Sequence, residues 1–204
     1  ALVLPTKDST GAVLLLLLTG DLVAIWVYRK HVDWRLIVRL IVPVLVGIGL
    51  GALFLSQVDG LVLKRTIGAI ILVLLVIGLW PDRLAAHKPA VGVAYGGLAG
   101  FTTMVANAGG PPMNLYLLAR KYDKWRFLGT TAWFFFAVNL TKLPVSISQS
   151  IVRPDTALLA LVLAPLVLIG TWIGRLTIKR IDQATFERLV TLFIAISAVY
   201  LVFS

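Results

Sequence analysis

The chain has 204 residues, of which 59% are hydrophobic and 14% are charged, and its mean hydropathy is +0.96. Soluble domains contain about 45–50% apolar and about 25% charged residues, so this composition excludes an ordinary soluble domain and predicts a polytopic membrane protein. The formal net charge of +10 comes from basic residues in short connections between apolar runs, which favours a role in membrane topology over nucleic-acid binding. The absence of cysteine excludes disulfides and thiolate chemistry.

Long apolar segments follow one another along the whole chain, and a helical membrane span needs roughly 20 such residues. The expected spans are Gly11–Tyr28, Leu36–Leu55, Thr66–Trp80, Val91–Ala106 with Met113–Ala119, Phe127–Ile147, Thr156–Leu176 and Leu189–Phe203. Runs such as Leu14–Leu18 do not alternate apolar and polar residues, as the strands of a membrane barrel would. The expected fold is therefore an all-α bundle of transmembrane helices.

The fourth of these segments is interrupted by Asn107-Ala108-Gly109-Gly110-Pro111-Pro112. Glycine adds backbone freedom and proline removes a backbone donor, so the helix is expected to break here. Within a membrane, such a break survives only where protein or a water-filled cavity covers it, and transporters build substrate sites from broken helices. The break is thus the first candidate for a functional site.

The side of the membrane to which Val91–Ala119 returns can be inferred from the positive charges. If the segment enters and leaves on one side as a hairpin, most lysines and arginines of the chain fall on a single side, as the positive-inside rule requires. A single crossing would mix them. The charge pattern favours the hairpin, with a kinked single crossing as the alternative.

A short pattern also occurs twice with a constant offset. Val46-Gly47-x3-Gly51-x-Leu53, followed by Asp59 and Arg65, matches Ile169-Gly170-x3-Gly174-x-Leu176, followed by Asp182 and Arg188. With the hairpin topology, the two copies run in opposite directions through the membrane, which is typical of secondary transporters. This predicts two inverted repeats, residues 1–85 and 86–204. The counterpart of the broken hairpin would then precede Ala1, so we expect a further hairpin upstream in the natural protein.

Several short motifs together resemble the TauE/SafE family. These are Gly100-Phe101-Thr102-Thr103, Asn107-Ala108-Gly109-Gly110-Pro111, Leu128-Gly129-Thr130-Thr131-Ala132 and Asn139-x2-Lys142. Members of that family are membrane permeases associated with the movement of sulfite, sulfonates and related anions. The resemblance covers essentially the whole chain. It implies a duplicated helical bundle in which each half opens with a glycine- and proline-containing segment, and the first copy of that segment is missing here.

The residues expected to contact a substrate lie at the break and on one later span. They are Thr102, Thr103, Asn107, Gly109, Gly110, Pro111, Met113, Asn114, Asn139 and Lys142. Pro111 and Pro112 suit the start of a half-helix, whose N–H groups near Met113 and Asn114 would face an anion together with the Asn107 amide. The alternative is a packing kink in which Asn107 bonds a neighbouring carbonyl. Each threonine alone more often bonds its own helix.

Two charged residues interrupt the apolar spans. Lys142 lies three residues after Asn139, so both occupy one helix face, from which a cation and an amide would complete an anion site. The alternative is that Lys142 extends to the membrane surface near Pro144. Asp21 could pair with Lys142, carry a coupling proton, or be a hydrogen-bonded structural residue, and the sequence leaves these three open.

The sequence therefore predicts a secondary transporter of a small anion, with sulfite or an organosulfonate as the substrate class, acting by alternating access. An anion channel with the same site is the alternative. No nucleophile grouping or metal-spaced cluster lies in the spans, so neither an enzyme nor a cofactor or metal is expected. The expected partners are the anion, the lipid bilayer and a coupling proton, with a homodimer left open. The expected location is the cell membrane, as an integral protein of a bacterial or archaeal inner membrane.

Overall fold

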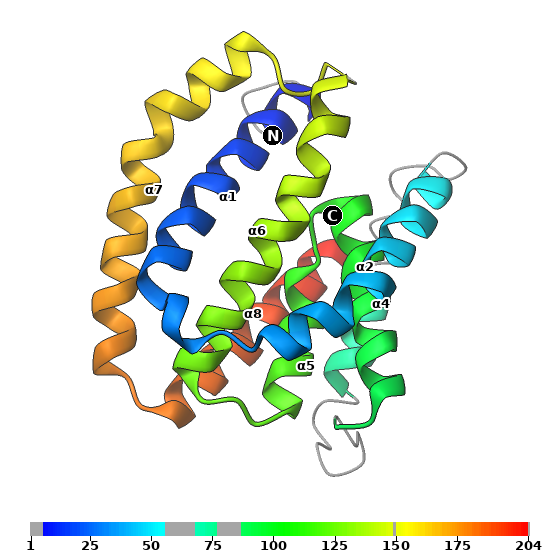
Figure 1. Ribbon diagram of the computed structural model, residues 1–204, viewed down its shortest axis with the longest axis vertical. Coiled ribbons are helices and arrows are strands. Elements are labelled where there is room, and N and C mark those ends of the chain that lie inside the picture. Colours follow the sequence, from blue (N-terminus) through cyan, green and yellow to red (C-terminus); the bar gives the residue numbers. More distant parts are fainter. Residues whose placement is uncertain (1–5, 56–67, 77–86, 149, 204) are drawn as a thin grey trace. The chain divides into compact units, whose positions relative to one another are not determined.

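The computed structural model describes residues 6–55, 68–76, 87–148 and 150–203, and every regular element in these ranges is helical (Figure 1). In chain order the elements are α1 (Thr6–Tyr28), η1 (Arg29–His31), α2 (Trp34–Leu55), α4 (Pro89–Ala106), α5 (Gly110–Ala119), α6 (Lys124–Ser148), α7 (Pro154–Arg180) and α8 (Gln183–Phe203). Residues 68–76 are helical as well.

The helices follow the apolar runs of the sequence closely, with ends that differ by a few residues from the expected spans. Within the described ranges, three helices are long and apolar enough to cross a membrane, namely Gly11–His31, Trp34–Phe54 and Pro154–Arg180. Only residues 68–76 of the expected span Thr66–Trp80 are described, and Asp59 and Arg65 of the repeated pattern lie outside the described residues. The all-helical class predicted for a membrane protein is confirmed.

The chain forms two compact units. Unit 1 comprises residues 1–32 and 128–181, and unit 2 comprises residues 33–127 and 182–204. Each unit therefore takes helices from both of the repeats predicted at 1–85 and 86–204. The inverted relation between those repeats stays a prediction.

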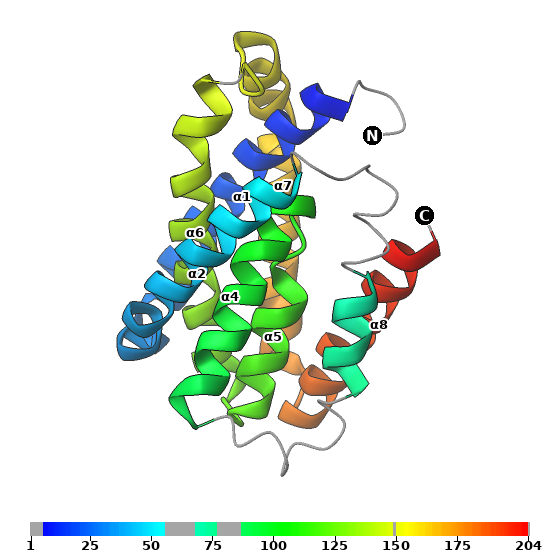
Figure 2. The same cartoon turned by 90° about the vertical axis from the view of Figure 1, so that its right-hand side faces the viewer.

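In unit 2, α2 and α4 meet backbone to backbone (Figures 1 and 2). A Cβ atom added at Gly47 would lie 2.0 Å from the carbonyl oxygen of Gly97. One added at Gly100 would lie 2.2 Å from the carbonyl oxygen of Val44. No side chain larger than hydrogen fits at these crossing points, so the glycines determine how closely the two helices approach.

Helix α5 folds back along α4 in the same unit (Figure 2). At the turn, a Cβ added at Gly109 would lie 2.8 Å from the Ala99 carbonyl oxygen. At the far end, the rings of Tyr95 in α4 and Tyr116 in α5 stack with their centroids 5.5 Å apart. The start of α5 thus lies beside the end of α4, and its end beside the start of α4. Helices α4 and α5 are therefore antiparallel, and their return to one side of the membrane stays a prediction.

In unit 1, α1 packs against α7. A groove of about 440 Å³ lies between them and is lined mostly by apolar side chains, with Gly170 and Gly174 of α7 on its wall. Helix α6 approaches the end of α1 at Gly129, where an added Cβ would lie 2.8 Å from the carbonyl oxygen of Tyr28. This close approach explains the glycine in the motif Leu128–Ala132.

Candidate functional site

Helix α4 ends at Asn107, which adopts the left-handed conformation with a φ of 53°. Asparagine tolerates this conformation better than most residues and often ends helices for that reason. The Asn107 N–H donates to the carbonyl oxygen of Thr103, and the Ala108 N–H donates to that of Thr102, both at 3.1 Å. These bonds use the last carbonyls of α4 and turn the chain away from the helix axis. The Asn107 side chain is exposed at the turn.

Helix α5 begins three residues later, and its first turn has few backbone donors. An α-helix normally leaves four N–H groups at its start without an intrahelical acceptor. Pro111 and Pro112 have no N–H, and the Met113 N–H donates to the Gly109 carbonyl oxygen at 3.3 Å. The available donors are therefore the N–H groups of Gly109 and Gly110, which have no acceptor among the described residues. The Met113 N–H thus has an acceptor within its own turn, and the contact of Met113 with an anion stays a prediction.

Gly110 is open, because no described atom beyond its chain neighbours and its own helix backbone lies within 4 Å of the position that its Cβ would occupy. Asn114 follows Gly110 by four residues and hence lies on the same face of α5. Its side-chain oxygen Oδ1 is buried and has no hydrogen-bond partner in the described part of the chain. Buried polar atoms are nearly always bonded, so an orphaned amide oxygen beside an open helix start is a candidate ligand contact.

The threonines that were expected to contact a substrate differ from Asn114 in their hydrogen bonding. Thr102 and Thr103 are both buried in α4. The Thr102 hydroxyl donates to the carbonyl oxygen of Leu98 at 2.8 Å, within its own helix. Thr102 therefore uses its donor in the way that threonines in membrane helices commonly do.

In unit 1, α1 and α6 are joined by a polar pair. The Asn139 side-chain Nδ2 donates to the Asp21 carboxylate at 2.8 Å, and Asn139 is only 4% exposed. Asp21 thus has a hydrogen-bond partner in the structure, and each of its three expected roles stays a prediction. Lys142 lies one turn further along α6, and the helix continues through Pro144 to Ser148. The helix therefore does not end at Pro144, and both the anion contact of Lys142 and its extension to the membrane surface stay predictions.

The structure groups the expected residues in two places. The α4–α5 hairpin of unit 2 contains Thr102 to Asn114, and α1 with α6 of unit 1 contains Asp21, Asn139 and Lys142. That both groups contribute to one anion site stays a prediction.

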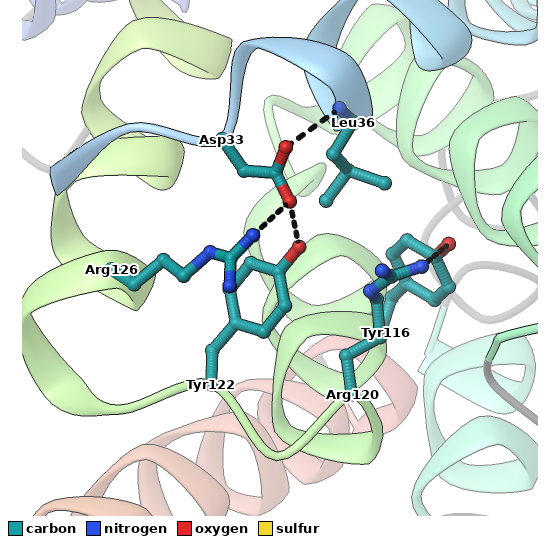
Figure 3. A network of polar contacts seen from close by, with 6 residues as sticks. All are labelled: Asp33, Leu36, Tyr116, Arg120, Tyr122 and Arg126. Carbon is teal, nitrogen blue, oxygen red and sulfur yellow. Dashed lines mark hydrogen bonds and ion pairs between the residues drawn. The ribbon is translucent and has the colours of Figure 1, made fainter.

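Sequence reasoning missed a polar network around Asp33, directly before α2 (Figure 3). Asp33 caps the helix, because its Oδ1 accepts the Leu36 N–H at 3.1 Å. Its Oδ2 accepts the Tyr122 hydroxyl and the Arg126 guanidinium, the latter at 2.8 Å. Asp33 is only 9% exposed. The network thus ties the start of α2 to the α5–α6 connection.

The network shifts the pKa values of its members. Burial alone raises the pKa of Asp33, but the hydrogen bonds from Tyr122 and Leu36 and the Arg126 charge outweigh burial, and the net pKa is lowered. Burial, together with the bond to Asp33, raises the pKa of Tyr122 to about 12. Asp33 is thus held as a carboxylate and Tyr122 as a neutral phenol across the physiological range.

Two arginines also contact the Tyr122 ring, with guanidinium-to-centroid distances of 4.5 Å for Arg126 and 5.4 Å for Arg120. Arg120 further donates to the Tyr116 hydroxyl at 3.3 Å. The sequence indicated only a general role in membrane topology for the basic residues of such connections. The available signal was Asp33, an acid directly before an apolar run in a basic loop, which is the pattern of a helix N-cap.

The family model "Sulfite exporter TauE/SafE" matches residues 1–201 of the chain. No curated protein and no solved structure matches it. The chain belongs to the TauE/SafE family, which is a family of membrane sulfite exporters and permeases.

Proposed function

We propose that this member of the TauE/SafE family moves a small sulfur oxyanion, sulfite or an organosulfonate, across the cell membrane of a bacterium or archaeon by alternating access. The α4–α5 turn is proposed to lie at membrane depth and to bind the anion. The observation that supports this most directly is the pair of N–H groups at Gly109 and Gly110, which have no acceptor among the described residues.

The chemistry of the turn suits an oxyanion. The start of a helix has a partial positive charge, and N–H groups there bind oxyanions in many proteins. Pro111 and Pro112 restrict this donation to the two glycines. Since Gly110 has no side chain and no described atom within 4 Å of its Cβ position, an anion can approach its backbone directly. The orphaned Asn114 oxygen is proposed to bond a protonated form of the anion or its bound water.

The second group is proposed to supply charge and coupling. A lysine within a membrane span is costly unless it lines a pathway or meets an anion, and Lys142 is proposed to do so together with Asn139. Asp21, bonded to Asn139 at 2.8 Å, is the proposed carrier of a coupling proton. Loss of the Asp21 proton would strengthen the hydrogen bond from Asn139 Nδ2, and its uptake would weaken that bond. Protonation would thereby act on Asn139, which lies one turn before Lys142.

The test is substitution of Gly110 by alanine in protein reconstituted in liposomes. The added methyl has room, so stability should be preserved, but the methyl covers the approach to the Gly110 N–H. Loss of a hydrogen bond to a charged ligand corresponds to about tenfold or more in affinity, so sulfite affinity and uptake should fall by about that factor. Gly170→Ala is the matched control, because its Cβ position is equally open. Unchanged affinity in Gly110→Ala would refute the role of the turn.

Lys142→Gln and a flux assay complete the test. Lys142→Gln should weaken sulfite binding by more than Gly110→Ala, because it removes a full charge. Saturable counterflow of labelled sulfite supports a transporter. Unitary currents in a planar bilayer would instead identify an anion channel and overturn alternating access.

A further inference from the structure

Helix α2 has two faces of opposite character. Leu36, Leu40 and Val44 are at most 5% exposed and lie on the side that packs against α4. On the other side, Val38 is 63% and Val42 is 67% exposed. Since Trp34–Phe54 is long and apolar enough to span a membrane, this outer face is the one expected to meet the hydrocarbon.

Two arginines lie at the beginning of this outer face. Arg35 and Arg39 are both exposed, and their spacing of four residues places them one turn apart on the same side of the helix. Neither forms an ion pair with any residue in the part of the chain that the structure describes. Trp34, beside them, is 50% exposed, as is common for tryptophan at the level of lipid headgroups.

The position of Arg39 is the unusual one. It lies about 7.5 Å along the helix from Trp34, at 1.5 Å per residue, with exposed Val38 and Val42 next to it. A charge among lipid-facing apolar residues is costly, and it is tolerated where the side chain reaches the interface or meets an opposite charge. On this face no described acid provides that charge.

We propose that Arg35 and Arg39 form a binding site for the phosphate headgroup of an anionic phospholipid, whose acyl chains lie along Val38 and Val42. A guanidinium binds phosphate oxygens bidentately, and two of them one turn apart suit the phosphates of cardiolipin or the single phosphate of phosphatidylglycerol. The apolar stripe above them continues to Leu53, which is 62% exposed. A lipid acyl chain covers such a stripe along its length, as a soluble anion cannot. The site uses none of the residues that are proposed to bind the transported anion.

The experiment compares lipids bound to the full chain in a neutral detergent, by native mass spectrometry and by lipid titration. Each basic residue near an anionic membrane surface contributes about fivefold in binding. The double variant Arg35→Gln/Arg39→Gln should therefore bind phosphatidylglycerol about 25-fold more weakly and lose its preference over phosphatidylcholine. The double variant Arg35→Lys/Arg39→Lys should keep part of the preference, since it retains the charge but not the guanidinium fork.

The matched control is Lys179→Gln/Arg180→Gln, which removes the same charge from the exposed last turn of α7. It should leave the lipid preference unchanged. Equal loss of preference in both double variants would show a general charge effect and overturn the site, as would full retention in Arg35→Gln/Arg39→Gln. Displacement of the lipid by millimolar glycerol phosphate would identify a soluble phosphate site instead. Sulfite transport by these variants is measured separately and does not bear on the lipid result.

Discussion

Helices α2 and α7 contain the same glycine pattern, but the two glycine pairs have opposite surroundings. In α2, Gly47 and Gly51 lie against the backbone of α4. In α7, Gly170 and Gly174 have no described atom within 4 Å of their Cβ positions outside their own helix. The same contrast holds along the helices, because 39% of the apolar window in α2 is buried but only 6% of that in α7. The pattern therefore permits close packing but does not require it.

The largest effect is expected at Gly47. A methyl at this position would lie 2.0 Å from the backbone oxygen of Gly97, and backbone cannot move aside as a side chain can. Overpacking of this kind costs up to about 3 kcal/mol and occasionally more. Gly47→Ala should therefore lower the thermal unfolding temperature in detergent markedly and reduce the yield of folded protein. A variant with wild-type stability would mean that α2 and α4 are not in backbone contact.

The next largest effect is expected at Asp33, which holds the start of α2. Asp33→Asn removes an acceptor of charge-assisted hydrogen bonds, at a cost of about 2 kcal/mol. The lowered pKa of Asp33 means that its contribution is present above its ordinary pKa of 3.8 and is lost as the pH falls through the lowered value. The raised pKa of Tyr122 means that its contribution is present below pH 10 and is lost as the pH rises toward about 12.

The measurement is the difference in unfolding temperature between wild type and Asp33→Asn as a function of pH. The difference should be largest from about pH 5 to 9 and shrink on the acidic side, where Asp33 in the wild type takes up a proton. Asp155→Asn is the control from α7, because Asp155 is 77% exposed and its contact with Arg153 is 3.5 Å long. A difference that does not change with pH would contradict the ion pair.

A moderate effect is expected at Gly51. Here an added Cβ would lie 2.9 Å from the Phe101 carbonyl oxygen and 3.0 Å from the Met104 Cβ. A small shift of the helices relieves these contacts, so Gly51→Ala should destabilise the protein by about 1 kcal/mol. The two losses in unfolding temperature are measured in the same thermal melts. Their ratio therefore reports how rigidly α4 is held against α2. Equal effects would indicate that the two helices separate as a whole.

The smallest effect is expected at Gly170. Its Cβ position is open, and alanine is favoured over glycine in a helix interior by roughly 0.5–1 kcal/mol. Gly170→Ala should leave the unfolding temperature unchanged or raise it slightly. A loss comparable to that of Gly47→Ala would show that a further helix covers this face of α7 and would remove the contrast between the two copies.

Some features of the structure could be predicted from the sequence, and others could not. Helix α4 ends at Ala106 and helix α5 begins at Gly110. Both positions follow from local chemistry, because glycine and proline act on their own backbone. The bond from the Met113 N–H to the Gly109 carbonyl and the network around Asp33 depend on three-dimensional contacts, which the sequence does not show directly. Asp33 and Arg126 are 93 positions apart, and their contact depends on how the residue before α2 meets residues 122–126 within unit 2.

The backbone contact between α2 and α4 has a mechanical consequence. Side chains between two helices can change rotamer and let the helices slide, but at Gly47 and Gly100 there are none to do so. Helix α5 is folded onto α4 at Gly109 in the same manner. We therefore expect the three helices to move together as one stiff element. We expect a movement that widens the turn at Gly109 to shift α4 together with α2, whose start is held by the bonds of Asp33.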